Sequence, residues 1–189
     1  MATLIIGLLA APRGAAAPVP GTQTEGTLTT VDAGTITVAT GAGTQIRVAL
    51  TGETVVIQRK LVTLQDIKPN DFVGVTARRE PDGSLTALSI NIFPPEFRGR
   101  VREAQFVMDT GNVMTNATVF QNVRRVEGRT LYLRLPDGTA VIAVPKDAQV
   151  IRLTLIPASS LKPGMRVMVR GTTGADGSMV ATTITVDAQ

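Results

Sequence analysis

The sequence of 189 residues contains neither cysteine nor histidine. Without cysteine the chain has no disulfide framework, no thiolate nucleophile and no ligands for an iron–sulfur cluster. Without histidine it has no imidazole to act as a general base or as a zinc ligand. These two absences remove the commonest designs of hydrolases and metalloenzymes. We therefore expect no enzymatic activity, no catalytic residues, no cofactor and no metal.

Aromatic side chains and strong charge are also scarce. The chain has no tryptophan, one tyrosine and five phenylalanines, and its formal net charge is +4. Its densest basic groups are Arg78-Arg79, Arg98 with Arg100 and Arg102, and Arg124-Arg125. Proteins that bind single-stranded nucleic acid typically draw about 1–3 kcal/mol per base from stacking on aromatic rings, and they usually carry a concentrated basic patch. A nucleic-acid partner is therefore disfavoured.

The residues that are present favour β-structure. Hydrophobic residues make up 43% of the chain, and most of them are Val, Ile, Leu and Ala, with many threonines beside them. β-branched residues pack well on the pleated surface of a strand. A chain of this length buries one medium core or two small ones. The composition predicts an all-β fold.

The first residues have the composition of a leader. Residues 3–11 are apolar and uncharged, and three alanines follow at 15–17, which is typical of a secretory signal peptide. We expect residues 1–16 to be this leader and residues 17–23 to be a linker. The cationic segment that usually comes first is missing, so either the start lies inside the leader or the leader is atypical. The run is too short to span a bilayer, and we expect a periplasmic or secreted protein with no transmembrane span after leader removal.

The chain contains an internal repeat. At an offset of 94 residues, Leu61–Asp71 aligns with Leu155–Met165, and the Asp-Gly-Ser at residues 82–84 aligns with the one at 176–178. Two copies of one unit are the simplest explanation. We expect a first repeat over residues 24–93, a linker and insertion over 94–116, and a second repeat over 117–187.

Each repeat consists of short alternating runs of apolar and polar residues, which turn-forming residues separate. These runs are 26–31, 35–40, 45–50, 54–58, 72–78 and 85–92 in the first repeat, and 130–135, 139–144, 149–153, 166–170 and 179–186 in the second. Pro69 leaves room for one helical turn before residue 72, because proline disfavours helix at the residue before it. We predict two tandem small antiparallel barrels of the OB-like kind, which would leave few open edges. A β-sandwich is the alternative.

The alternation also predicts which side chains face inward. In the first unit these are Ile36, Val38, Ile46, Val48, Val73, Val75, Leu85 and Ile90, and in the second they are Leu131, Leu133, Val167, Val169 and Ile184. We expect one core in each repeat.

Several short motifs resemble the bacterial family DUF5666. They are the Gly-Thr-Ile-Thr-Val of residues 34–38, the Leu-Lys-Pro-Gly of residues 161–164 and the Asp-Gly-Ser before the last strand. The Met-Thr-Asn-Ala-Thr-Val of residues 114–119, with Phe93–Gly99, is similar to a two-repeat proteobacterial subgroup. The resemblance covers about residues 24–187, and it implies an exported, β-barrel-like domain without an assigned activity.

Four carboxylates lie near turns of the first repeat, and oxygen ligands of this kind suit Ca²⁺. They are Asp66, Asp71, Glu80 and Asp82. The second repeat has Ser160, Met165, Gly174 and Asp176 at these places, so that one carboxylate of the four recurs. We interpret them as ordinary turn residues.

The insertion between the repeats is the best candidate for a specialised surface, because duplication does not explain it. We predict a loop or flap over residues 99–120, unless Ala117–Phe120 supplies the first strand of the second repeat. The candidate partner-binding residues are Arg98, Arg100, Arg102, Met114 and Asn116. We expect a non-enzymatic binding or assembly module of the bacterial envelope, with an envelope protein or polysaccharide as partner and an oligomeric state left open. The alternative is an OB-like protein that binds nucleic acid or another polyanion.

Overall fold

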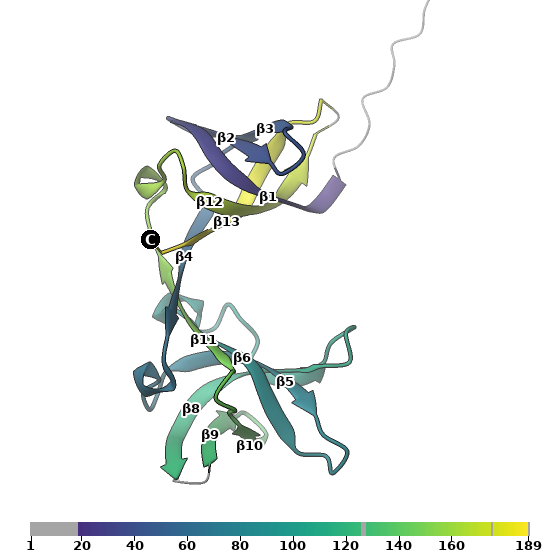
Figure 1. Ribbon diagram of the computed structural model, residues 1–189, viewed down its shortest axis with the longest axis vertical. Helices are drawn as coiled ribbons and strands as arrows, with labels where there is room; N and C mark the ends of the chain where they lie inside the picture. The colour runs from purple at the N-terminus through teal and green to yellow at the C-terminus, as the bar shows by residue number, and fades with distance from the viewer. Residues whose placement is uncertain (1–18, 126–127, 175, 189) are drawn as a thin grey trace, which may run out of the picture.

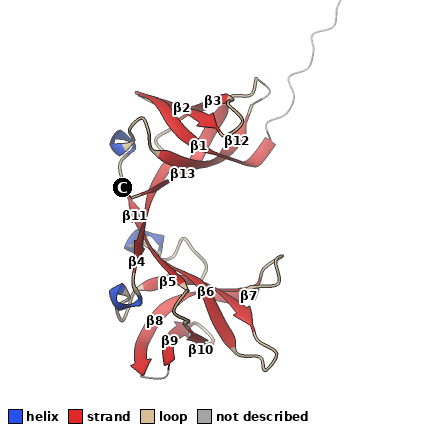
Figure 2. Ribbon diagram, viewed as in Figure 1, coloured by secondary structure: helices blue, strands red, loops and turns tan. Residues whose placement is uncertain are grey.

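The computed structural model describes residues 19–125, 128–174 and 176–188 (Figure 1). The predicted leader, residues 1–16, lies outside them. The described residues form strands and three single turns of 3-10 helix, which confirms the all-β prediction (Figure 2). Within these ranges no helix has the length and apolarity needed to cross a lipid bilayer. The elements are β1 (Val19–Asp32), β2 (Thr35–Thr40), β3 (Gln45–Ala49), β4 (Val55–Val62), η1 (Leu64–Asp66), β5 (Phe72–Arg79), β6 (Leu85–Ile92), η2 (Pro95–Phe97), β7 (Ala104–Val107), β8 (Val113–Arg125), β9 (Gly128–Leu135), β10 (Gly138–Ala143), β11 (Gln149–Leu155), η3 (Ala158–Ser160), β12 (Arg166–Thr173) and β13 (Met179–Asp187).

The element order repeats with the spacing that the sequence predicts. β4, η1, β5 and β6 are followed 94 residues later by β11, η3, β12 and β13. β5 begins at Phe72 and β12 at Arg166, and β6 begins at Leu85 and β13 at Met179. These secondary-structure elements therefore recur with the period of the sequence repeat.

A tight turn after each single helical turn shows why the helix stops. In the first repeat the Asp71 amide donates to the Lys68 carbonyl at 3.1 Å. Asn70 has a φ of 70°, and its equivalent Gly164 has a φ of 87°. A turn with proline at its second position and a positive φ at its third is of type II, where glycine or asparagine is favoured. The chain thus leaves the helical turn and enters β5 or β12.

All strands of the described residues belong to one sheet. Its order is β10-β9-β8-β5-β6-β11-β4-β13-β12-β1-β2-β3, and β7 pairs with β8 beside this path. Both ends of the path turn back, because β3 also pairs with β13 and β10 also pairs with β6, both in parallel. Figure 1 shows the result as two lobes, with β4 and β11 running between them. We refer to them as the upper and lower lobes, as they stand in that view.

Each lobe contains strands from both repeats. The upper lobe joins β1, β2 and β3 of the first repeat to β12 and β13 of the second, and the lower lobe joins β8, β9 and β10 to β5 and β6 (Figure 1). β1 pairs with β12 from Val19 to Thr27, and β8 pairs with β5 from Val113 to Thr118. The two repeats have exchanged their last two strands.

The buried side chains form two clusters, one in each lobe. The upper cluster is Leu28, Ile36, Val38, Val48, Val56, Leu161, Val167, Val169, Met179, Ala181, Ile184 and Val186. The lower cluster is Leu64, Ile67, Val73, Val75, Ala77, Leu85, Ala87, Ile90, Ile92, Val113, Ala117, Val119, Leu131, Leu133, Ala140, Ile142, Val144 and Val150.

The side chains predicted to face inward are buried, apart from Ile46, which is half-buried against the upper cluster. The prediction that each repeat has its own core is wrong. Ile36 and Val38 lie in the upper cluster, whereas Val73 and Val75 of the same repeat lie in the lower one. The reason is that alternation determines which face of a strand is apolar but does not determine which strand lies next to it.

The exchange gives the molecule an internal pseudo-twofold axis. β4 and β11 are antiparallel, and Arg59 pairs with Leu153. These two residues are themselves 94 positions apart, so the repeat maps this pair onto itself. The neighbouring pairs Ile57 with Leu155 and Leu61 with Ile151 map onto each other in the same way. The axis therefore passes through the Arg59–Leu153 pair.

The insertion between the repeats forms a hairpin rather than the predicted loop or flap. β7 pairs with β8 from Ala104–Asn116 to Val107–Val113, and the Met108 amide donates to the Asn112 carbonyl at 2.8 Å to close the turn. β8 begins at Val113 and continues to Arg125. The alternative in which residues 117–120 belong to the first strand of the second repeat is therefore correct.

Candidate functional site

A shallow groove crosses the sheet where β4 and β11 join the two lobes. Its volume is about 400 Å³, and alternate residues of five adjacent strands form its surface. We call it the seam groove. It is lined by Ile57 and Arg59 of β4, Ser89 and Asn91 of β6, Gln149, Ile151 and Leu153 of β11, Met168 and Arg170 of β12, and Thr183 and Thr185 of β13.

The alternation of the strands directs these side chains into the groove. Successive residues of a strand point to opposite faces of the sheet. In β4, Val56 packs into the upper cluster, and its neighbour Ile57 lies in the groove. In β11, Val150 packs into the lower cluster, and Ile151 lies in the groove. The same pattern that builds the cores therefore builds the groove.

Arg59 lies at the centre of this surface. Besides the seam groove it lines two adjoining hollows of about 480 and 230 Å³. Its Nη1 is 3.9 Å from Oδ1 of Asp187, whose side chain is 71% exposed. An exposed ion pair of this length contributes only about 0–1 kcal/mol. The Arg59 guanidinium is thus available to a ligand that offers a carboxylate or a phosphate.

The charge around the groove is mainly positive. Arg170 lines the groove itself, and Lys60 and Arg166 line the adjoining hollows. The carboxylates of these hollows are Glu25 and Asp187. With Arg59 counted, cations outnumber carboxylates here, so the surface favours an anionic ligand over a cationic one.

Arg98, one of the predicted partner-binding residues, is already bound within the molecule. Its guanidinium carbon lies 5.4 Å from the centre of the Phe72 ring. Its Nη1 donates to the Thr118 hydroxyl at 2.9 Å, and its Nη2 donates to the Asn70 carbonyl. These contacts anchor the linker after β6 to the lower lobe, so the side chain has a structural role here.

A row of aromatic rings supports the same linker. The centres of the Phe72 and Phe93 rings are 5.2 Å apart, and those of Phe93 and Phe97 are 5.9 Å apart. A Cβ on Gly74 would come within 2.7 Å of the Phe93 ring, so glycine is needed where this ring crosses β5. Three of the five phenylalanines are therefore used to fix the linker.

The other predicted partner-binding residues lie around β7. Met114 and Asn116 are half-buried on β8 and pair with β7 residues, and the Asn116 Nδ2 donates to the Arg102 carbonyl at 3.4 Å. The side chains of Arg100 and Arg102 are exposed, and neither forms a hydrogen bond or ion pair with a described residue. The structure thus brings Arg102, Met114 and Asn116 together and leaves two arginine side chains in solvent.

The carboxylates considered as calcium ligands are used by their own turns. Asp66 accepts hydrogen bonds from the Thr63 amide and hydroxyl, each at 2.8 Å, and these bonds lower the pKa of Asp66. Asp71 accepts a bond from the Lys68 amide at 2.8 Å. Within the described residues no group of three or more acidic side chains is placed to hold a metal ion.

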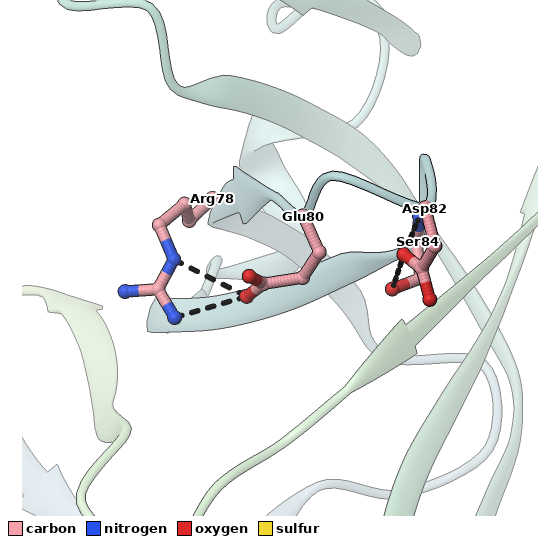
Figure 3. Close-up of polar contacts among 4 residues, drawn as sticks. All are labelled: Arg78, Glu80, Asp82 and Ser84. Atoms are coloured by element: carbon pink, nitrogen blue, oxygen red, sulfur yellow. Dashed lines mark hydrogen bonds and ion pairs between the residues drawn. The ribbon is translucent and has the colours of Figure 1, made fainter.

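The hairpin turn between β5 and β6 holds the remaining two carboxylates (Figure 3). Asp82 accepts bonds from the Ser84 hydroxyl at 2.7 Å and the Ser84 amide at 2.9 Å, which lower the pKa of Asp82. Glu80 accepts two bonds from Arg78, at 2.9 and 3.2 Å, and these lower the pKa of Glu80. Asp176 makes the same turn contacts in the second repeat. These groups shape hairpins and do not converge on a ligand.

Sequence reasoning missed the seam groove, because its residues come from five strands and form no motif. The repeat offset makes β4 and β11 equivalent strands, but every β4 residue has an equivalent 94 positions later. Only the antiparallel register selects Arg59 and Leu153 as the centre.

A comparison with models of protein families finds a match for this chain. A family model described as a domain of unknown function, DUF5666, matches residues 25–91 and 145–185. No curated protein and no solved structure matches the chain. The first matched segment runs from β1 to β6 and the second covers β11 to β13. The match therefore covers more than half of the chain, with β7 to β10 between its two segments, and the chain belongs to the DUF5666 family.

Proposed function

We propose that each lobe is a small barrel of the OB kind, built from strands of both repeats. The pairings support this proposal. In the upper lobe the order β1-β2-β3-β13-β12 returns to β1, and in the lower lobe β8-β9-β10-β6-β5 returns to β8. Each ring has a parallel contact between its third and fourth strands in this order, β3 with β13 and β10 with β6, and closure of this kind protects strand edges.

We propose that the chain is an exported, non-enzymatic binding or assembly module of the bacterial envelope, and that it holds its partner in the seam groove. The observation that carries this proposal is the groove itself. It extends across both lobes and combines the half-buried aliphatic side chains of Ile57 and Leu153 with the weakly paired Arg59. Pockets that bind ligands usually join apolar walls to a few polar groups in this way.

Site-specific photocrosslinking in the native host tests the groove. A benzophenone amino acid at Gln149, which is exposed in the groove, should give specific adducts. The same amino acid at Thr139, which is exposed on β10 away from the described hollows, is the matched control. Arg59→Glu should reduce the Gln149 adducts. Equal adducts at both positions, or adducts that ignore Arg59→Glu, would contradict the proposed site.

The excess of cations around the groove favours a second candidate, a polyanion-binding protein. Binding to heparin or to a single-stranded oligonucleotide would then weaken steeply with salt, because each neutralised phosphate releases counterions. Arg59→Gln and Arg170→Gln would each reduce the slope of log K against log salt by about 0.7 for a single strand. A salt-independent partner would support the envelope protein or neutral polysaccharide instead.

Export is a separate part of the proposal, and it is supported by the apolar run at residues 3–11 and the alanines that follow it. The intact mass of the protein purified from its host should lack about 16 residues at the N-terminus. A cytoplasmic protein that retains Met1 would contradict export without affecting the proposed groove.

A further inference from the structure

The two lobes differ at one strand edge. In the lower lobe, β8 has β5 on one side and both β7 and β9 on the other. In the upper lobe, the equivalent strand β1 has β12 on one side and β2 on the other, and β2 reaches only as far as Gly26. No described strand takes the place of β7 beside residues 23–25 of β1.

The correspondence between β1 and β8 follows from their registers. Thr27 pairs with Arg166 in the upper lobe, and Thr118 pairs with Phe72 in the lower lobe. Since Phe72 and Arg166 are repeat equivalents, β1 residues correspond to β8 residues 91 positions later. Gln23 and Glu25 therefore correspond to Met114 and Asn116.

The hydrogen-bonding direction of these residues follows from alternation. In an antiparallel pair, every second residue directs its backbone groups to a given neighbour. The Met108 amide bonds the Asn112 carbonyl at the end of the hairpin, so Met114 and Asn116 are the β8 residues that face β7. By the same alternation, Gln23 and Glu25 direct their backbone amides and carbonyls to the side of β1 where no strand of the described residues lies.

The burial of the intervening threonines shows what β7 contributes. Thr115 of β8 is fully buried, and its hydroxyl accepts a bond from the Gln105 side chain of β7 at 2.9 Å. Its equivalent Thr24 is only half-buried. The β1 edge thus has the same polar backbone groups and the same threonine as the β8 edge, but no strand of the described part of the chain covers it.

We infer that the β1 edge at Gln23–Glu25 is a docking site for an extended peptide strand of a partner protein, which adds antiparallel to β1 as β7 adds to β8. This is strand addition to a sheet edge. The chemistry of the edge specifies the occupant: a hydrogen-bonding side chain opposite Thr24, as Gln105 is opposite Thr115, and a cationic side chain opposite the exposed Glu25. The site lies on the β1 edge rather than in the seam groove, although Glu25 also lines the smaller of the two adjoining hollows.

Amide exchange measured by NMR on the full chain tests whether the edge is open. The amides of Met114 and Asn116 should be protected, and those of Gln23 and Glu25 should exchange at least tenfold faster. Equal protection in the free chain at low concentration would overturn the inference, because the edge would already be covered. Protection that rises with protein concentration would also overturn it, since a second copy would then be the occupant.

An octapeptide with the sequence of residues 102–109 is the probe for docking. At saturation it should slow exchange at Gln23 and Glu25. N-methylation at its Ala104 and Phe106 positions, which face β8 in the chain, should weaken binding more than tenfold. N-methylation at the Gln105 and Val107 positions is the matched control and should leave binding unchanged. Absence of slowing, or equal loss from both methylated peptides, would overturn the inference.

A charge exchange tests the predicted chemistry. The Ala104 position of the peptide lies opposite Glu25 in the proposed register, so its Ala104→Lys form should bind about two- to fivefold more tightly than the parent peptide. The chain variant Glu25→Lys should reverse this preference. Glu53→Lys, at an exposed residue beyond β3, is the control and should leave the preference intact. A preference that survives Glu25→Lys would overturn the register.

Discussion

The exchange of strands between the repeats predicts that a core mutation in one repeat loosens the strands of the other. Ile90 and Ile184 are repeat equivalents, and both are completely buried. Ile90 belongs to the lower cluster, with β8, β9 and β10, and Ile184 belongs to the upper cluster, with β1, β2 and β3. The pair therefore offers the same substitution in two positions with opposite expected effects.

The magnitude follows from the atoms removed. Ile→Ala deletes three carbons, which at about 0.8 kcal/mol per buried methylene corresponds to about 2.4 kcal/mol of lost transfer free energy. A fully buried site leaves a cavity as well, and the total loss in the free energy of unfolding should be about 3–4 kcal/mol. Since about 1.4 kcal/mol is a factor of ten, amides that exchange by opening of the affected lobe should exchange more than a hundredfold faster.

Hydrogen–deuterium exchange with mass spectrometry is the assay. Ile90→Ala should accelerate exchange in β8, β9 and β10 and spare β1, β2 and β3, although Ile90 and β1 belong to the same repeat. Ile184→Ala should do the reverse. Selective acceleration of β1–β3 by Ile90→Ala would refute the exchanged arrangement. Equal acceleration everywhere would refute the reasoning that the lobes open separately.

Three further predictions follow from other contacts. Replacing Arg100–Asn112 by a short Gly/Ser linker should leave the chain folded but uncover Thr115, lowering the melting temperature by roughly 2–8 °C; an unfolded product would show that the hairpin is essential to the fold. Gly171→Ala should destabilise the chain strongly, because its Cβ would lie 2.0 Å from the Val180 carbonyl oxygen, whereas Gly41→Ala, with nothing within 4 Å, should be neutral in urea unfolding. The hydrogen bonds from Ser84 that lower the pKa of Asp82 stabilise the fold at pH values above the unfolded pKa of about 3.9, and this stabilisation is lost as the pH falls through the folded pKa. The difference in melting temperature between the parent and Asp82→Asn should therefore be constant at neutral pH and vanish in acid. A difference that persists in acid would contradict this assignment.

The sequence predicts the strands of this fold well, because their signals are local. β2 and β6 have the predicted bounds, Thr35–Thr40 and Leu85–Ile92, since alternation and turn residues define both ends. The type II turn at Pro69 likewise stops the helical turn where the proline requires. Such features depend on residues that are close together in the chain.

The arrangement of the strands in the sheet is harder to predict, because the sequence does not determine which strands pair with each other. The repeats are similar, so β5 and β6 present an apolar face that fits β8–β10 as well as β1–β3. Alternation within each strand is satisfied by either partner. The hairpin of β7 was missed for a different reason: a four-residue strand is too short to show a period, and Gln105 interrupts its apolar character.

The candidate site residues show the same contrast between local sequence signals and strand pairing. The cluster of arginines in the sequence indicates Arg98 as a binding residue, but its guanidinium contacts Phe72 and Thr118. Arg59 has only Lys60 as a charged neighbour in the sequence, and it becomes central only when β4 pairs with β11. A site assembled by strand pairing is invisible until the pairing is known.

The exchanged strands also determine how the molecule responds to a protease. A nick in the linker between β6 and β7 would produce two fragments, each of which supplies strands to both lobes. Neither fragment can leave until both lobes open, so the nicked molecule stays whole through contacts alone. The two halves made as separate polypeptides should for the same reason complement each other and assemble into the native structure.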